Sequence, residues 1–151
     1  MMHTTATSHR STATRILLVA FAAWAFSRAA ATALPVTIDE AVPSLNISRH
    51  LEYFEDLVRG VLAHRAALDA SLEPFLDRGI EEVDQIERAM LRISAYELQH
   101  RIDVPYRVII DEALRAVKRF GSEHGHTYVN GVLDHAAAQW RALEMQAARG
   151  K

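Results

Sequence analysis

The spacing of apolar residues from residue 53 onward most constrains what this chain can fold into. Apolar side chains recur there at steps of three and four, as at Leu57 and Val61 and again at Ile109, Ala113 and Ala116. Such spacing gathers apolar groups on one face of an α-helix. No stretch alternates between apolar and polar residues over more than a few positions, so the sequence predicts no β-strand. The expected fold is all-α.

Helix boundaries follow from proline, glycine and capping residues. Pro74 and Gly79 end the first long helical pattern, Asp103-Val104-Pro105 separates the next two, and Gly121 ends the third. Residues 34–48 are expected to form a linker with one short helix at 38–41. A compact bundle of six to seven helices is therefore predicted. The long helices are expected at about 53–76, 82–101, 105–121 and 126–147.

The N-terminal segment allows two interpretations. Residues 16–26 are eleven consecutive apolar residues, preceded by Arg10 and Arg15 and followed by small residues. That order is typical of a secretory signal peptide, and eleven residues are too few to cross a bilayer. The same run also fits a buried first helix of the bundle. An exported helical protein therefore stays open as an alternative at this point.

Composition indicates no catalytic or metal centre. The 151 residues carry a formal net charge of −2 and contain no cysteine, which removes disulfides and thiolate chemistry. His124 and His126 are two residues apart, but no third metal ligand is identifiable. The sequence has no Gly-rich phosphate loop and no nucleophile elbow. We therefore expect neither an enzyme nor a cofactor.

One region mixes cations, aromatic rings and an amide in a way that suits single-stranded RNA. Arginine and lysine neutralise phosphates, rings stack on bases, and an asparagine reads a base edge. The alternative is that the rings belong to the core and the asparagine serves helix packing. The residues concerned are Tyr106, Arg107, Lys118, Arg119, Tyr128 and Asn130.

Three stretches resemble the NusB family. They are Glu87-Arg88-x-x-Leu91-Arg92-Ile93-x-x-Tyr96-Glu97-Leu98, Asp103-Val104-Pro105-Tyr106, and Phe120-Gly121 followed by His126-x-x-Val129-Asn130-Gly131-Val132-Leu133-Asp134. The resemblance covers roughly residues 49–140, and it implies an all-α domain of two small helical subdomains. The expected organisation is an N-terminal arm at 1–9, subdomains at 10–77 and 80–147, and a tail at 148–151.

The resemblance also implies a function. NusB proteins are bacterial transcription antitermination factors that bind boxA-type RNA of ribosomal-RNA transcripts together with NusE, a small-subunit ribosomal protein. The pair acts with NusA, NusG and RNA polymerase. A cytoplasmic protein without membrane contact, cofactor or catalysis is implied. Homodimerisation through the apolar residues 16–26 is a further state that the sequence allows.

The N-terminal helix departs from the family pattern. Arg10 fits a basic position, Arg15 lies one place from another, and Ser11 and Thr12 stand where the family has arginines. Because the basic arm is depleted, the alternative function is a protein-interaction module whose RNA binding is weakened or lost. His124 replaces an acidic residue common in the family, and this loss of negative charge near the RNA surface partly offsets the missing arginines.

Residue by residue, the sequence and the resemblance together assign two sets of contacts. The partner-binding set is Glu81, Glu87 and Arg88. The RNA-binding set is Arg10, Arg15, Arg78, Tyr106, Arg107, Lys118, Arg119, Tyr128 and Asn130.

Overall fold

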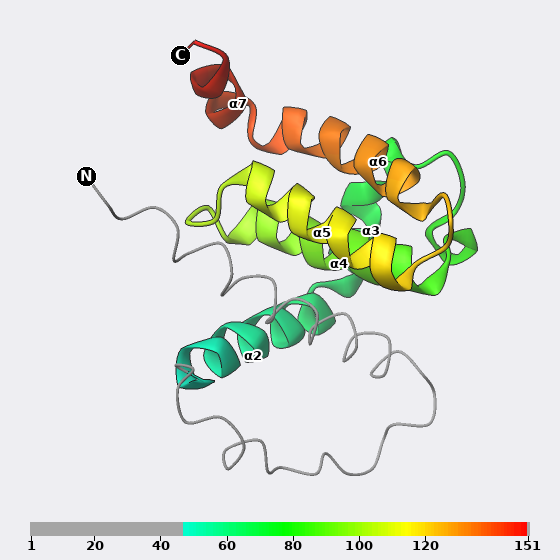
Figure 1. Ribbon diagram of the computed structural model, residues 1–151, viewed down its shortest axis with the longest axis horizontal. Coiled ribbons are helices and arrows are strands. Elements are labelled where there is room, and N and C mark those ends of the chain that lie inside the picture. Colours follow the sequence, from blue (N-terminus) through cyan, green and yellow to red (C-terminus); the bar gives the residue numbers. More distant parts are fainter. Residues whose placement is uncertain (1–46, 151) are drawn as a thin grey trace.

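The computed structural model describes residues 47–150, which form helices joined by short turns (Figure 1). No strand occurs in this range, so the expected all-α fold is confirmed. The predictions for Arg10, Arg15, the apolar run 16–26 and the linker 34–46 lie outside the described residues. The elements are α2 (Ile47–Ala63), α3 (Arg65–Leu72), the 3-10 turns η1 (Glu73–Phe75) and η2 (Ile80–Glu82), α4 (Gln85–His100), α5 (Tyr106–Phe120), α6 (Gly125–Trp140) and α7 (Ala142–Arg149).

The helix α4 lies at the centre of this arrangement. Every residue from Ala89 to Leu98 is buried, whereas an ordinary surface helix buries one face. The helices α2, α3, α5 and α6 all contact α4, which explains this complete burial. One apolar core joins Leu57 on α2 to Leu133 on α6, so it contains residues from both sides of the expected subdomain boundary.

The first long helix of the prediction is divided in two. His64 leaves helical geometry at φ −108° and ψ 14°, and α3 starts immediately after it. The break follows a close helix crossing at Gly60, where an added Cβ would lie 2.1 Å from the Tyr96 ring. Pro74 then lies in the first turn of η1, where its fixed φ is favourable.

The last helix is also divided, and the single helix expected over 126–147 is wrong. Arg141 adopts φ −124° and ψ 34° between α6 and α7. Its buried guanidinium donates to the carbonyl oxygens of Leu98 at 2.7 Å and Arg101 at 2.9 Å. These carbonyls belong to the end of α4, where a cation is stabilised by the helix dipole. Residues far away in the sequence thus fix this break.

The start of α7 completes the contact with α5. Glu144 binds the Arg141 guanidinium at 2.6 Å and accepts the backbone N–H of Tyr106 at 3.0 Å. That N–H opens α5 and has no partner within its own helix. Among the described helices, none is both long and apolar enough to span a membrane.

Candidate nucleic-acid interface

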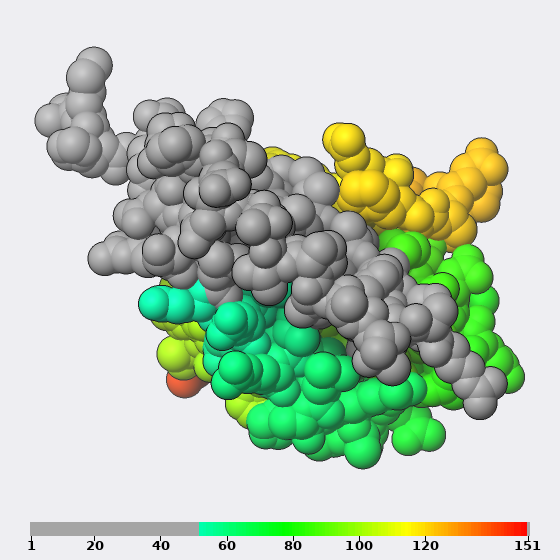
Figure 2. All heavy atoms as spheres, turned by 90° about the horizontal axis from the view of Figure 1, so that it is seen from below, coloured from blue at the N-terminus to red at the C-terminus, as the bar shows by residue number. Residues whose placement is uncertain are grey.

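Except for Asn130, the expected RNA-binding residues that the structure describes fall at two ends of the bundle. One end, which we call the Tyr128 end, comprises residues 76–82 and 118–128. The other, the Tyr106 end, comprises residues 101–107 and 141–145. Figures 1 and 2 show the green segment around η2 beside the yellow-to-orange turn between α5 and α6, which places both parts of the Tyr128 end together.

At the Tyr128 end, Arg78 and Tyr128 form a cation–aromatic pair. The Arg78 guanidinium carbon lies 5.0 Å from the centroid of the Tyr128 ring. Tyr128 is half-buried, and burial raises the pKa of its hydroxyl, with a further contribution from the negative charge of Asp77. A cation over a partly exposed ring offers a nucleic acid both a phosphate contact and a stacking surface.

Lys118 and Arg119 extend this end along the last turn of α5. Both side chains are exposed, and their charge is stabilised by the C-terminal end of the helix dipole. The Arg119 guanidinium lies 5.5 Å from the centroid of the Phe120 ring, which is 40% exposed. Phe120 was not among the expected RNA contacts, although its place between a cation and Gly121 is visible in the sequence.

The buried side chain of Glu87 on α4 binds the turn between α5 and α6. This residue is 2% exposed, and its Oε1 accepts the backbone N–H of Ser122 at 2.8 Å and the Ser122 hydroxyl at 2.6 Å. A Cβ at Gly125 would lie 1.8 Å from Oε1, so only glycine permits this approach. Glu87 was predicted to bind a partner, but its carboxylate is buried and faces the turn between α5 and α6.

At the Tyr106 end, the tyrosine ring belongs to the core. Tyr106 is 8% exposed, which leaves little of the ring for a base. Its hydroxyl accepts a hydrogen bond from Arg107 Nε at 3.0 Å, and the exposed guanidinium lies 5.8 Å from the ring centroid. Tyr106 thus orients Arg107, an exposed cation at this end of the bundle.

The two ends are linked along α5 and α6. Arg107 and Lys118 are eleven residues apart on one helix, which puts them on the same face about 16 Å apart. Asn130 lies half-buried on α6, between the two ends of that helix. A single strand several nucleotides long can therefore contact both cations while passing along this side of the bundle.

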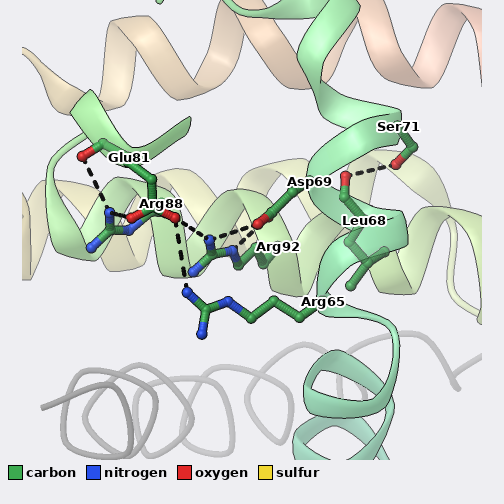
Figure 3. Close-up of polar contacts among 7 residues, drawn as sticks. All are labelled: Arg65, Leu68, Asp69, Ser71, Glu81, Arg88 and Arg92. Atoms are coloured by element: carbon green, nitrogen blue, oxygen red, sulfur yellow. Dashed lines mark hydrogen bonds and ion pairs between the residues drawn. The ribbon is translucent and has the colours of Figure 1, made fainter. Parts of the chain in front are cut away.

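Glu81 and Arg88, expected to bind a partner, belong to a charge cluster shown in Figure 3. Glu81 Oε2 pairs with Arg88 at 2.8 Å, and Glu81 Oε1 lies 3.5 Å from Arg92 and 3.8 Å from Arg65. Arg92 is 1% exposed and binds both carboxylate oxygens of Asp69, at 2.7 and 2.8 Å. Glu81 keeps 68% of its side chain exposed, so it remains accessible to a partner.

Neither Arg92 nor Asp69 was predicted to have a role. Their partnership spans 23 residues, and it ties α3 to α4 beneath the exposed Glu81. The signal in the sequence is that Arg92 stands between Leu91 and Ile93, among the apolar positions of the predicted 82–101 helix. A buried arginine needs a carboxylate partner, but the pattern does not say which one.

His124 and His126 lie close together at the start of α6. The described residues contain no group of three or more histidine, aspartate or glutamate side chains that could hold a metal ion. His124 is exposed and stands at the N-cap of α6 without a capping hydrogen bond from its side chain.

Comparison with known proteins assigns the chain to a family. The model of the NusB family matches residues 16–138, a range that includes the apolar run 16–26. A relative from Xanthomonas oryzae pv. oryzae (strain PXO99A), named transcription antitermination protein NusB, is 57% identical over 135 residues, covering 89% of this chain and 85% of its own. One from Xanthomonas campestris pv. campestris (strain B100), with the same name, is 68% identical over 94 residues, covering 62% of this chain and 59% of its own.

Solved structures agree with this assignment. T. maritima NusB superposes with a TM-score of 0.67 at 26% sequence identity, covering 90% of this chain and 92% of that one. The all-helical architecture and the sequence match thus point to the same group of proteins. The chain belongs to the NusB family.

Proposed function

We propose that this protein is a transcription antitermination factor that binds boxA-type RNA of ribosomal-RNA transcripts together with NusE. In this role it joins NusA, NusG and RNA polymerase in the cytoplasm and performs no catalysis. Family membership, with relatives named transcription antitermination proteins, is the observation that carries the proposal. Within the described residues, the Tyr128 end supplies the chemistry that RNA requires.

Three features of the Tyr128 end support RNA as the ligand. Arg78, Lys118 and Arg119 provide positive charge at one end of the bundle. The rings of Tyr128 and Phe120 lie beside two of these cations and keep part of their surface exposed. Cations interleaved with rings bind single strands, because phosphates and unstacked bases are recognised together.

The second candidate is a protein-interaction module with weak RNA affinity. Its specific support is that several cations are already paired inside the chain: Arg78 with Asp77, and Arg88 with Glu81. RNA affinity is also lowered by the net charge of −2, and by the presence of Ser11 and Thr12 where the family has arginines. Glu81 in its charge cluster is then the main contact for a partner.

A gel-shift experiment separates these candidates. The full chain is mixed with an RNA oligonucleotide that carries a boxA-type element, with and without NusE, and a scrambled oligonucleotide serves as the control. We expect a shift that is stronger with NusE and that weakens steeply as salt rises, because phosphate contacts release counterions. Absence of any boxA-dependent shift with NusE present would overturn the RNA-binding function.

If NusE binds but RNA does not, the variant with Ser11→Arg and Thr12→Arg tests the cause. Recovery of the shift would show that the depleted N-terminal arm had removed RNA affinity. No recovery, with NusE still bound, would support the interaction module.

A further inference from the structure

An exposed ion pair at the Tyr128 end joins two neighbouring residues, Asp77 and Arg78. Arg78 Nε donates to Asp77 Oδ1 at 2.8 Å, and Arg78 Nη2 donates to Asp77 Oδ2 at 3.1 Å. This two-pronged geometry is the one by which arginine binds a phosphate. The two guanidinium nitrogens that could bind a phosphate are thus hydrogen-bonded to the neighbouring Asp77.

The pair differs from the arginine pairs that join separate helices. Arg92 with Asp69 and Arg101 with Asp56 each tie two helices together. Asp77 and Arg78 lie in the same short segment between η1 and η2, so their pairing closes no long-range contact. Their side chains are 63% and 48% exposed, respectively. The fold therefore gains little from this pair.

The position of the pair connects it to RNA. The guanidinium that Asp77 binds is the one that lies over the Tyr128 ring. The hydrogen bond from Arg78 lowers the pKa of Asp77, which favours the charged form of the carboxylate. A phosphate that approaches Arg78 meets a competing anion already bound to the fork.

We infer that Asp77 sets the affinity of the Tyr128 end for RNA by acting as an internal substitute for a phosphate on Arg78. The inference rests on the proposed RNA-binding function. RNA must displace the Asp77 carboxylate before a phosphate can bind both prongs of Arg78. Removal of the carboxylate charge leaves the arginine in place and makes its fork available.

The expected magnitude is modest, because exposed ion pairs are weak. Replacement Asp77→Asn should tighten RNA binding about two- to fivefold. If one more phosphate is then neutralised, the slope of log affinity against log salt becomes steeper by about 0.7 for a single strand. Removal of a negative charge elsewhere on the surface also raises the affinity for RNA, but it adds no phosphate contact and so leaves this slope unchanged.

The test is a double-mutant cycle on the full chain with NusE and the boxA-type oligonucleotide. Affinities are measured by fluorescence anisotropy at several salt concentrations for the wild type, Asp77→Asn, Arg78→Ala and the double variant. Glu73→Gln is the matched control, since it removes one exposed negative charge four residues earlier, at the start of η1. Thermal melting of each variant checks that the fold is intact.

Three outcomes are decisive. Tighter binding by Asp77→Asn that exceeds the effect of Glu73→Gln and disappears in the Arg78→Ala background supports the inference. Equal effects of Asp77→Asn and Glu73→Gln, or a gain that persists without Arg78, would overturn it. Failure of the wild type to bind RNA at all would instead overturn the proposed function, so the two failures are distinguishable.

Discussion

Replacement of Glu87 tests how the turn between α5 and α6 is held. Its carboxylate is 2% exposed and accepts two hydrogen bonds from Ser122, one from the backbone at 2.8 Å and one from the hydroxyl at 2.6 Å. Its second oxygen, Oε2, is buried and has no hydrogen-bond partner among the described residues. The side chain therefore binds the turn through a single oxygen.

The magnitude follows from these contacts. Hydrogen bonds to a charged acceptor contribute about 1.5–3 kcal/mol each, and burial of the unpaired Oε2 opposes that gain. We expect Glu87→Ala to lower the free energy of unfolding by about 2–4 kcal/mol. Glu87→Gln retains an acceptor of the same shape and should lower it by about 1 kcal/mol. Ser122→Ala removes only the hydrogen bond from the hydroxyl, so it should also lower the free energy of unfolding by about 1 kcal/mol.

Urea denaturation followed by circular dichroism measures these differences. Hydrogen exchange in parallel should show faster exchange at Ser122 and Gly125 in Glu87→Ala than in Ser122→Ala. A loss below about 0.5 kcal/mol for Glu87→Ala would refute the reasoning, because ordinary surface substitutions fall in that range. The turn would then be fixed by its own backbone and not by α4.

Three further substitutions probe the fold. Arg141→Met leaves Glu144 and the last carbonyls of α4 without their cation. Chemical denaturation should show that the free energy of unfolding falls by about 3–5 kcal/mol. A decrease of less than about 1 kcal/mol would contradict the role of Arg141 at the end of α4. Gly60→Ala places a Cβ against the Tyr96 ring, and the melting temperature should fall markedly, whereas an unchanged value would show that α2 and α4 separate freely. Gly131→Ala meets open space on α6 and should stabilise by up to about 1 kcal/mol, with destabilisation as the contrary result.

Helix periodicity was sufficient to predict the core of the fold. The expected helices at 82–101 and 105–121 correspond to α4 and α5, because their ends carry local signals such as Pro105 and Gly121. The break at Arg141 carries no such signal. It depends on carbonyl groups at the end of α4, about forty residues earlier in the chain.

The candidate site was predicted less completely, for the same physical reason. Charge and aromatic character predicted Tyr128, and the family resemblance predicted Arg78, but neither indicated that Asp77 pairs with the arginine. In the sequence Glu87 looks like an exposed helix residue, because no residue near it in the chain indicates a hydrogen-bond partner for a buried carboxylate. Its burial follows from Ser122, 35 residues later, which supplies the hydrogen bonds that make a buried carboxylate tolerable.

The most direct test of the account is to locate the RNA on the protein. The full chain with NusE is crosslinked by ultraviolet light to a boxA-type oligonucleotide that contains 4-thiouridine, and the modified peptides are identified by mass spectrometry. The account predicts that, within residues 47–150, crosslinks concentrate at the Tyr128 end, in peptides carrying residues 76–82 or 118–128. Crosslinks confined to α2, α3 or α7 would contradict it.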